Sequence, residues 1–461
     1  MPSSSSPSLA RPSALSTRSL NRQILALAVP AFGALVAEPL FVLGDTAIVG
    51  HLGTEPLAGL TLGATVIQTL VGLMIFLSYS TTPAVARAFG AGDLHAAYVS
   101  ARDGLWAALL VGVVLALGMW FFAEPLLRAM GGGGEVLGFA LDYLRLSLLG
   151  LPAMLIVLAA VGTLRGLQDT KTPLYVASVG ALINLLLSWF FVYPVGLGVA
   201  GSAIATATVQ WGMAAVMGWI VLRGMHRHGV GVETHFAGIF SVFRVGSWLM
   251  LRTLTMRIAL LATVFVVTAQ GSENLAAYQL TMSFFNLLAF SLDSLAIAAQ
   301  ALLGKEMGAQ DLGTEQGRAA VIELKNRLIR WSLGFGVILG ILCPIIGFAG
   351  GWIFTPDPAV QHLFALATLV IAVGQPIAAY VFILDGVLIG AQDVRYLALV
   401  SIATLAFYVP LLAAVHLVFA KNSHEAGSIA FVALWISYAL GYMGARALTL
   451  GLRARQAAWV K

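Results

Sequence analysis

The sequence has 461 residues, of which 59% are hydrophobic and only 10% are charged, and its mean hydropathy is +0.92. Soluble domains carry about 25% charged residues, so this composition excludes an ordinary soluble protein and favours a surface that faces lipid. The net charge of +5 does not indicate nucleic-acid binding, because Lys and Arg gather on the cytoplasmic side of membrane proteins. Cys343 is the only cysteine, which excludes an intrachain disulfide.

The chain starts with a polar stretch that is rich in Ser, Pro and Ala. We expect residues 1–22 to form a disordered cytoplasmic tail, because such a composition buries too little apolar surface to fold. The apolar run that follows begins near Ile24 and continues past Leu43. It is longer than the core of a signal peptide, so we predict that it forms the first membrane-spanning helix.

Twelve long apolar runs follow one another along the chain, separated by polar turns or turns with Gly and Pro. A spanning helix needs about 20 mostly apolar residues, and a helix satisfies its own backbone polar groups in lipid. We therefore predict an all-α membrane protein with twelve transmembrane helices. The predicted spans are 23–48, 57–82, 99–123, 137–163, 173–193, 199–222, 241–269, 275–303, 328–354, 361–388, 394–419 and 427–450.

The basic residues indicate how these spans are oriented. Lys and Arg lie before the first span, around alternate loops and after the last span, whereas the opposite loops hold only Arg128 and Lys421. Loops that are rich in Lys and Arg stay in the cytoplasm. We therefore predict a multi-pass protein of the plasma (inner) membrane with both termini in the cytoplasm.

The two halves of the sequence resemble each other. Five motifs of the first half recur in the same order in the second half, at an offset that grows from 218 to 226 residues. Because each half has six predicted helices, both halves enter the membrane from the same side, and the repeat is parallel. The recurring pairs are Gly53–Gly59 with Gly271–Ala277, Gly90–Asp93 with Gly308–Asp311, Gly150–Pro152 with Gly374–Pro376, Gly162–Asp169 with Gly386–Asp393, and Ala200–Ser202 with Ala426–Ser428.

This repeat predicts the domain organisation. We expect a first lobe over 23–222 and a second lobe over 241–452, related by a pseudo-twofold axis along the membrane normal. Residues 223–240 are the predicted cytoplasmic linker, and residues 453–461 are the predicted C-terminal cytoplasmic tail. Transporters with two such lobes hold substrate between them, so the pattern favours a secondary transporter.

Charged residues inside the predicted spans are candidates for function, because a charge at the bilayer centre costs about 2.5–3.5 kcal/mol. Glu38 and Asp45 are seven residues apart and share a face of the first helix. Burial favours the neutral form of a carboxyl, which brings its protonation within reach of physiological pH. Pro39 removes a backbone donor between them and is a predicted hinge. We expect Asp45 to face a cavity in the first lobe.

The second lobe has its own charged residues within predicted spans. Asp293 lies in the eighth predicted helix, Asp385 in the tenth and Arg252 in the seventh. Charges on the lipid face would be costly, so we expect Asp385 and one of its charged neighbours inside the second lobe. Two interpretations stay open: a buried Asp–Arg pair that is purely structural, or a role in transport.

Other kinds of chemistry have no support in the sequence. It contains neither the GxxxxGK[ST] phosphate loop nor the HExxH zinc motif. We therefore predict no catalytic residues, no metal site and no cofactor, and we do not expect an enzyme. Without a nucleotide site, an ion gradient is the simplest energy source for transport.

Several motifs together resemble the multidrug and toxic compound extrusion (MATE) family, and within it the DinF-like branch. The resemblance covers about residues 20–450. It implies an efflux transporter of two six-helix lobes in which Asp45 acts in coupling. The motifs that carry it are Pro39–Gly53, Gly196–Thr206, Arg252–Thr253 and Leu384–Gly386.

The sequence also departs from some patterns of this family. Many relatives have an Asn in the fifth helix and a carboxylate four residues later, whereas here Asn184 is followed by Ser188. The acids that some sodium-coupled relatives carry in helices 7 and 10 fall on Met256 and Ala378. The resemblance therefore implies that Asn184 shares a polar network with Asp45, that protons are the coupling ion, and that sodium is the second choice.

The predicted function is that of an antiporter that exports cationic or polar organic compounds in exchange for protons. The alternatives are sodium-coupled efflux, organic-anion efflux, and a lipid-linked oligosaccharide flippase of the same superfamily. Such a flippase would line its cleft with more basic residues than Arg252 and Arg257. The predicted partners are a small-molecule substrate and the lipid bilayer, with no nucleic acid, and we expect a monomer.

Overall fold

The structure, a computed structural model, describes residues 17–419 and 427–460, and it leaves the side chains of Thr17, Arg18, Glu38 and Ala457 undescribed. Residues 1–16 of the predicted tail and Lys421 of a predicted outer loop lie outside the described residues. All regular elements among the described residues are helices, which confirms the all-α prediction.

The helices follow the predicted spans closely. A π-helical turn, η1 (Ser437–Tyr442), joins α14 to α15, and a short 3₁₀-helix, η2 (Ala457–Trp459), follows α15. The α-helices are α1 (Thr17–Gly50), α2 (Thr54–Leu73), α3 (Phe76–Gly90), α4 (Leu94–Ala129), α5 (Gly134–Leu148), α6 (Leu151–Gly166), α7 (Lys171–Val192), α8 (Gly198–Arg227), α9 (Phe236–Thr268), α10 (Ser272–Ala309), α11 (Glu315–Phe354), α12 (Pro358–Gly390), α13 (Val394–Phe419), α14 (Gly427–Ile436) and α15 (Met443–Arg455).

The helix α1 begins at Thr17, so it includes residues 17–22, which we predicted as part of the tail. Leu20 is buried against the hydrophobic core, and the indole nitrogen of Trp331 donates to Asn21 Oδ1 at 2.7 Å. These contacts hold the start of the helix on the protein. The connection between the lobes is also shorter than predicted, since only 228–235 separate α8 from α9.

The described helices form twelve membrane spans if one bent pair is counted as a single span, which confirms the predicted number. The bent pair is α5 and α6, which meet at an angle of 48°. Two residues account for the break. A Cβ on Gly150 would lie 2.9 Å from the Cα of Ala207 in α8, and Pro152 is at the start of α6, where its missing N–H is tolerated.

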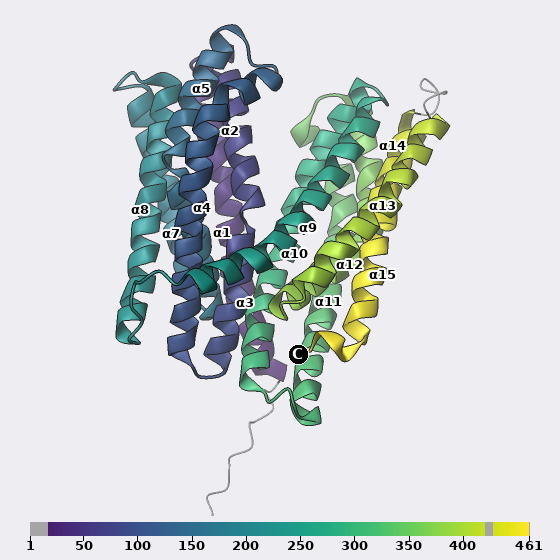
Figure 1. Ribbon diagram of the computed structural model, residues 1–461. Helices are drawn as coiled ribbons and strands as arrows, with labels where there is room; N and C mark the ends of the chain where they lie inside the picture. The colour runs from purple at the N-terminus through teal and green to yellow at the C-terminus, as the bar shows by residue number, and fades with distance from the viewer. Residues whose placement is uncertain (1–16, 420–426, 461) are drawn as a thin grey trace, which may run out of the picture.

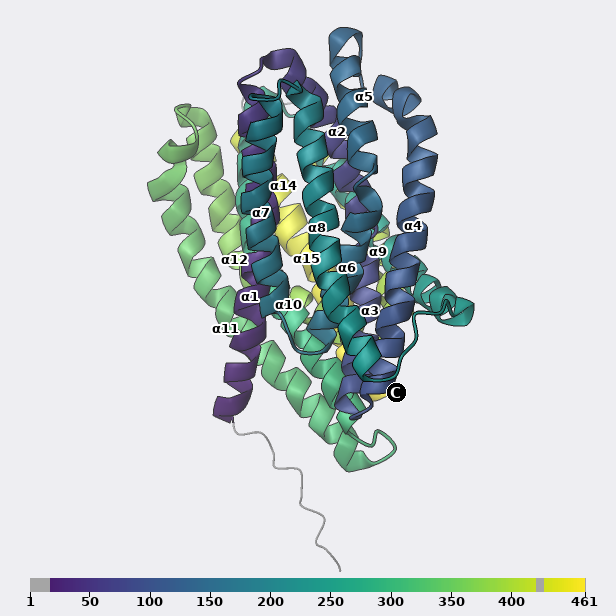
Figure 2. The same ribbon diagram turned by 90° about the vertical axis from the view of Figure 1, so that its left-hand side faces the viewer.

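The spans form two bundles. In Figure 1, α1–α8 lie on the left and α10–α15 on the right, while α9 starts in front of the left-hand bundle and rises into the right-hand one. The bundles diverge towards the end far from the C-terminus. Figure 2, turned by 90°, shows the first bundle in front of α14 and α15. The contact between bundles is made mainly by α10, which packs against α3 and α1.

The repeat seen in the sequence recurs in the backbone. Gln168 and Gln392, equivalent positions of the two halves, both have a left-handed conformation, with φ of 67° and 60°. In each turn the next amide bonds back to a helix carbonyl, from Asp169 to Leu164 at 2.8 Å and from Asp393 to Leu388 at 2.9 Å. This is the pattern that ends a helix through a left-handed residue. The same sequence motif therefore makes the same helix end in both lobes.

The two lobes touch through a pair of equivalent glycines at the ends of α3 and α10. A Cβ on Gly90 would lie 1.9 Å from the carbonyl oxygen of Lys305, and a Cβ on Gly308 would lie 1.8 Å from that of Arg87. Gly90 corresponds to Gly308 in the repeat, and Arg87 corresponds to Lys305. Each lobe thus presents the same glycine to the same backbone carbonyl of the other lobe, as a pseudo-twofold axis requires.

Candidate functional site

Asp45 lies in α1 and is only 3% exposed. Two hydroxyl groups bind its carboxylate. Ser188 of α7 donates to Oδ1 at 2.6 Å, and Thr206 of α8 donates to Oδ2 at 3.2 Å. Three helices that are adjacent in the bundle but distant in the sequence therefore meet at this carboxylate.

Asn184 completes this group of side chains. It is buried one helical turn before Ser188 in α7. In the amide orientation that leaves its oxygen and nitrogen satisfied, it donates to Asp45 Oδ1 at 3.2 Å and accepts from Thr206. The network of Asp45 therefore consists of neutral donors, and no ion pair to Asp45 occurs within residues 17–419 and 427–460.

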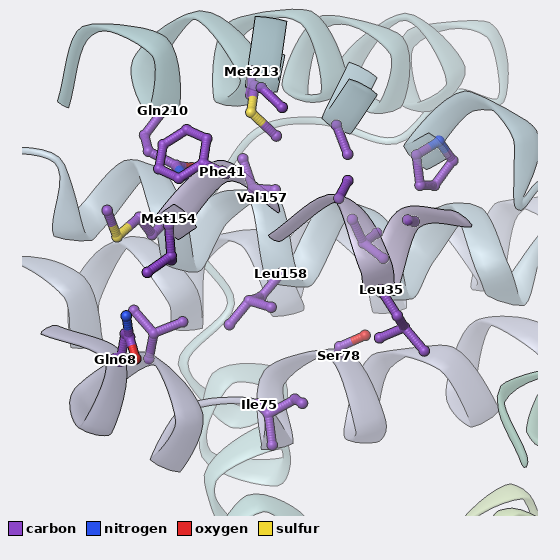
Figure 3. Close-up of a pocket in the computed structure, with 18 of the residues that line it drawn as sticks. Leu35, Phe41, Gln68, Ile75, Ser78, Met154, Val157, Leu158, Gln210 and Met213 are labelled. Atoms are coloured by element: carbon purple, nitrogen blue, oxygen red, sulfur yellow. The ribbon is translucent and has the colours of Figure 1, made fainter. Parts of the chain in front are cut away.

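A cavity of about 250 Å³ lies beside this network in the first lobe. Figure 3 shows Gln210 and Met213 on one side of it and Gln68 and Ile75 on the other. Its wall is mostly apolar, and the cavity has room for a small organic molecule. The residues that line it come from α1, α2, α3, α5, α6, α7, α8 and α10.

Asp45 does not itself line this cavity, contrary to our expectation. Thr206 forms part of the wall and lies between Asp45 and the open space. Four residues before Asp45 along α1, Phe41 points into the cavity, and Asp45 is turned towards α7 and α8 instead. The carboxylate is one hydrogen bond away from the cavity wall.

The other predicted residues of α1 are close to the same cavity. Ala37 and Phe41, which flank Pro39 at a distance of two residues, line it. The helix continues through Pro39 without a break in its assignment. The side chain of Glu38 is outside the described part of the chain, so its predicted role stays a prediction.

In the second lobe Asp385 is buried between two arginines. Arg252 of α9 donates from Nη2 to Asp385 Oδ2 at 2.8 Å, and Arg446 of α15 donates to the same oxygen at 2.5 Å. All three side chains are less than 10% exposed. They line a second cavity of about 180 Å³.

Asp293 lies between the lobes and not only inside the second lobe. It belongs to α10 and lines both cavities, as does Tyr79 of α3. Arg165 of α6 lines the first cavity together with Asp293. The charged residues of the two lobes are therefore brought towards one another at the boundary of the two cavities.

Sequence reasoning missed four side chains of these sites. Thr206 ends the Gly196–Thr206 motif, and Ser188 lies one helical turn after Asn184, so both positions could have been found from the sequence. Arg446 lies within the predicted span 427–450, where the cost of an intramembrane charge makes it a candidate. Arg165 lies two residues after the predicted span 137–163, and the structure buries it.

Among the described residues, no three His, Cys, Asp or Glu side chains lie close enough together to hold a metal ion.

Comparisons with known proteins agree with one another over most of the chain. The model of the MatE family matches residues 30–190 and 249–414. Protein DETOXIFICATION 43 of Arabidopsis thaliana is 27% identical over 489 residues, which cover 93% of this chain and 89% of the relative. DNA damage-inducible protein F of Escherichia coli K12 is 29% identical over 375 residues, with 79% of each chain covered.

Solved structures also have this fold. The crystal structure of the Vibrio cholerae MATE transporter VcmN in its bent form matches with a TM-score of 0.85 and 18% identity, covering 96% of this chain and 99% of the other. At this identity the match shows the fold, which is the predicted arrangement of twelve helices in two lobes.

Proposed function

We propose, from the premise that this chain belongs to the MatE family, that it is an antiporter that exports cationic or polar organic compounds in exchange for protons. Membership of the family confirms the resemblance that the motifs carry, and it makes the chain a multi-pass membrane transporter of the efflux type. The coupling ion, the substrate class and the orientation in the membrane belong to the proposal.

The observation that supports it best is the environment of Asp45. A charged carboxylate without an ion pair is expensive in a low-dielectric interior. Ser188 and Thr206 reduce this cost through hydrogen bonds but bring no positive charge. A proton, or a cation in the adjacent cavity, supplies the positive charge that the network lacks. The two compete for one carboxylate, which is the requirement for exchange.

The steps of the exchange follow from that competition. Deprotonated Asp45 attracts a cationic group into the first cavity, and Thr206 connects the carboxylate to the cavity wall. A proton that arrives from outside neutralises Asp45 and removes the attraction, so the substrate leaves outwards. The lobes then change orientation, and the proton leaves to the cytoplasm. Each ligand must bind the two orientations with different affinity for this cycle to work.

α1 is the element that couples the carboxylate to the shape of the cavity. Pro39 cannot donate a backbone hydrogen bond within the helix, so α1 bends more easily there than at a residue that makes this bond. Ala37 and Phe41 on either side of it line the cavity. A bend at Pro39 driven by neutral Asp45 would move these side chains into the space that the substrate has left.

Sodium is the second choice of coupling ion. A hard cation takes oxygen ligands. The network offers such oxygen atoms from Asp45, Ser188, Thr206 and Asn184. The network has one carboxylate, however, because Ser188 stands where many relatives have a second acid. A single carboxylate suffices for a proton, and this favours protons.

The proposed location is the plasma (inner) membrane, with both termini in the cytoplasm and a single chain as the working unit. With this orientation, the glycine contact of α3 and α10 closes the cytoplasmic side, and the bundles diverge towards the outside (Figure 1).

The test is transport by the purified chain in proteoliposomes that contain ethidium as a cationic probe. An imposed pH gradient, without sodium, should drive ethidium movement, and collapse of that gradient should stop it. Transport that follows a sodium gradient and ignores the pH gradient would overturn the choice of protons. Transport that needs neither gradient would overturn the antiporter.

A further inference from the structure

The first helix of each bundle begins on the other bundle. α9 starts in front of the first bundle (Figure 1), and the start of α1 lies beside α11 of the second bundle (Figure 2). Further along, α1 packs against α7 of the first bundle, and α9 packs against α13 of the second. We call residues 17–25 the α1 arm and residues 228–246 the α9 arm. Each arm is thus a segment of one bundle that is seated on the other.

The α9 arm is fixed to α3 and α4 of the first bundle. The indole nitrogen of Trp106 in α4 donates to the carbonyl oxygen of Val232 at 2.9 Å. Ile239 is buried, and a Cβ on Gly246 would overlap the ring of Phe76 in α3. Close packing and one indole hydrogen bond therefore hold this arm in place.

The α1 arm is fixed to the second bundle in a similar way. The indole nitrogen of Trp331 in α11 donates to Asn21 Oδ1 at 2.7 Å. Ile24, one turn after the start of this contact, is buried in the hydrophobic core. The arm ends where α1 returns to the first bundle, because the carbonyl oxygen of Ala26 accepts from the hydroxyl of Thr170 at 3.4 Å.

The two tryptophans belong to equivalent helices. α4 follows the motif Gly90–Asp93, and α11 follows its counterpart Gly308–Asp311. Each indole donates its hydrogen bond to an arm of the other bundle, which is the reciprocal arrangement that a pseudo-twofold axis produces. The acceptors differ, since one is a backbone carbonyl and the other is a side-chain amide. The arrangement therefore recurs in space although the residues that accept do not.

These two bonds join the bundles at the end where the bundles meet. An indole has a single N–H donor, so it bonds either to the arm or to water. One such bond changes an equilibrium about two- to tenfold. Separation of the bundles at this end would pull each arm away from its tryptophan, because α1 and α9 each continue as one helix into their own bundle.

We propose that Trp106 and Trp331 are reciprocal latches that hold the two bundles together at the end where they meet. Both hydrogen bonds are formed in the present state, and both break when the bundles separate there. The proposal rests on the proposed exchange, since the change of lobe orientation requires this separation. The two tryptophans act as positioning residues, because neither lines the two cavities described above.

The test measures distances between the bundles by pulsed electron paramagnetic resonance, with the full chain in lipid nanodiscs. Spin labels at Lys171→Cys and Gln316→Cys, in a Cys343→Ser background, report on exposed positions at the starts of α7 and α11. Trp106→Phe and Trp331→Phe each remove the donor and keep an aromatic ring. Each should raise the ratio of longer to shorter distances about two- to tenfold, and the effects should multiply in the double variant.

A variant on the acceptor side tests the same bond from the other bundle. Asn21→Ala should act like Trp331→Phe, and the two together should act like either alone, because all three lose one hydrogen bond. Trp211→Phe is the matched control, since the indole of Trp211 donates to the carbonyl oxygen of Leu149 at 2.9 Å within the first bundle. It should leave the distances unchanged, even if it lowers the melting temperature.

Unchanged distances in the double variant Trp106→Phe with Trp331→Phe would overturn the proposal, because the arms would then follow the bundle on which they are seated. Equal lengthening in Trp211→Phe would overturn it as well. The distances are measured without substrate and without an ion gradient, so the two proposals fail separately. Longer distances without ethidium transport would support the latches and overturn the exchange. Proton-driven ethidium transport with unchanged distances would support the exchange and overturn the latches.

Discussion

Asp45 and Asp385 are both buried carboxylates, but their neighbours differ in charge. Asp45 is bound by the hydroxyls of Ser188 and Thr206, whereas Asp385 is bound by two guanidinium groups. Neutral donors bring no positive charge to Asp45, whereas two guanidinium groups bring two positive charges to Asp385. The same residue type therefore lies in a neutral hydrogen-bond network in one lobe and in an ion-pair network in the other.

The first prediction concerns Asp45→Asn. An amide has nearly the same shape and still accepts from Thr206, so we expect normal folding and a melting temperature that is unchanged or higher, because a buried charge is removed. Ethidium transport driven by a pH gradient should fall about tenfold or more, which corresponds to about 1.4 kcal/mol of lost differential interaction. Proteoliposome flux and thermal unfolding in detergent measure the two effects.

Ser283→Ala is the control for that experiment, because Ser283 is exposed and bonds only within its own helix. It should transport like the unmodified chain. Full transport by Asp45→Asn would remove Asp45 from the coupling mechanism.

The second prediction compares Asp385→Asn with Asp45→Asn. Loss of the Asp385 charge leaves Arg252 and Arg446 close together without a counter-ion, and breaking a buried ion pair costs about 3–5 kcal/mol. We therefore expect a clear fall in the melting temperature of Asp385→Asn, and none for Asp45→Asn. The double variant Asp385→Asn with Arg446→Gln removes the repulsion and should recover part of the loss. Equal melting temperatures for the two single variants would contradict this assignment.

At the scale of elements, equivalent motifs of the two halves do not always give the same structure. Gly150–Pro152 separates α5 from α6 with a bend of 48°, while the equivalent Gly374–Pro376 lies inside the continuous helix α12. By contrast, Gly162 and Gly386 both meet a backbone carbonyl of a crossing helix, that of Ser78 and that of Ala296. Helix crossings are repeated in both lobes, and helix continuity is not.

The third prediction concerns the crossing of α3 and α10. A Cβ needs about 3 Å of clearance, but at Gly90 it would lie 1.9 Å from a carbonyl oxygen of the other lobe. Gly90→Ala should therefore force the backbones apart and favour the state in which the lobes are separated at this end. Gly308→Ala should act in the same way, because the contact is pseudo-symmetric.

Spin labels at His226→Cys and Gln456→Cys, both exposed and in different lobes, measure this separation in a Cys343→Ser background. The distance distribution should gain a longer component in Gly90→Ala and Gly308→Ala. Gly118→Ala is the control, since a Cβ there meets nothing within 4 Å, and it should leave the distribution unchanged. Identical distributions in all variants would mean that the crossing does not limit the lobe positions.

At the scale of the whole molecule, the two bundles meet near the chain ends that the structure describes and diverge at the opposite end (Figure 1). The asymmetry of Lys and Arg predicts that the meeting end lies in the cytoplasm. The outward-facing end then exposes the region between the bundles. The orientation is thus predicted from charge. It implies that the region between the bundles is open to the outside of the cell.

The fourth prediction tests this orientation with single cysteines in loops at the two ends. Gly133→Cys, between α4 and α5, should react with a membrane-impermeant maleimide on intact cells. Gly231→Cys, between α8 and α9, should react only after the membrane is permeabilised. Both positions are exposed and have free space for a side chain, and the native Cys343 is buried. The reverse pattern would invert the topology and the direction of the proposed transport.

Much of the architecture was already determined by the sequence alone. The number of spans, the two halves and the all-α class depend on the hydropathy of successive segments and on recurring motifs. These are local properties, because each spanning helix must satisfy its own backbone in lipid wherever it packs. Asp45 and Asp385 could be selected for the same reason, since a charge in an apolar run is costly in any fold.

Only the tertiary structure decided what these charges meet. Asp45 and its partners Ser188 and Thr206 are separated by 143 and 161 residues, and the contacts depend on how α1, α7 and α8 pack. Helix packing also turned Asp45 away from the cavity and brought Arg446 onto Asp385. Hydropathy carries no information on which face of a helix meets which neighbour, because in lipid these interfaces depend on close packing and polar contacts between helices.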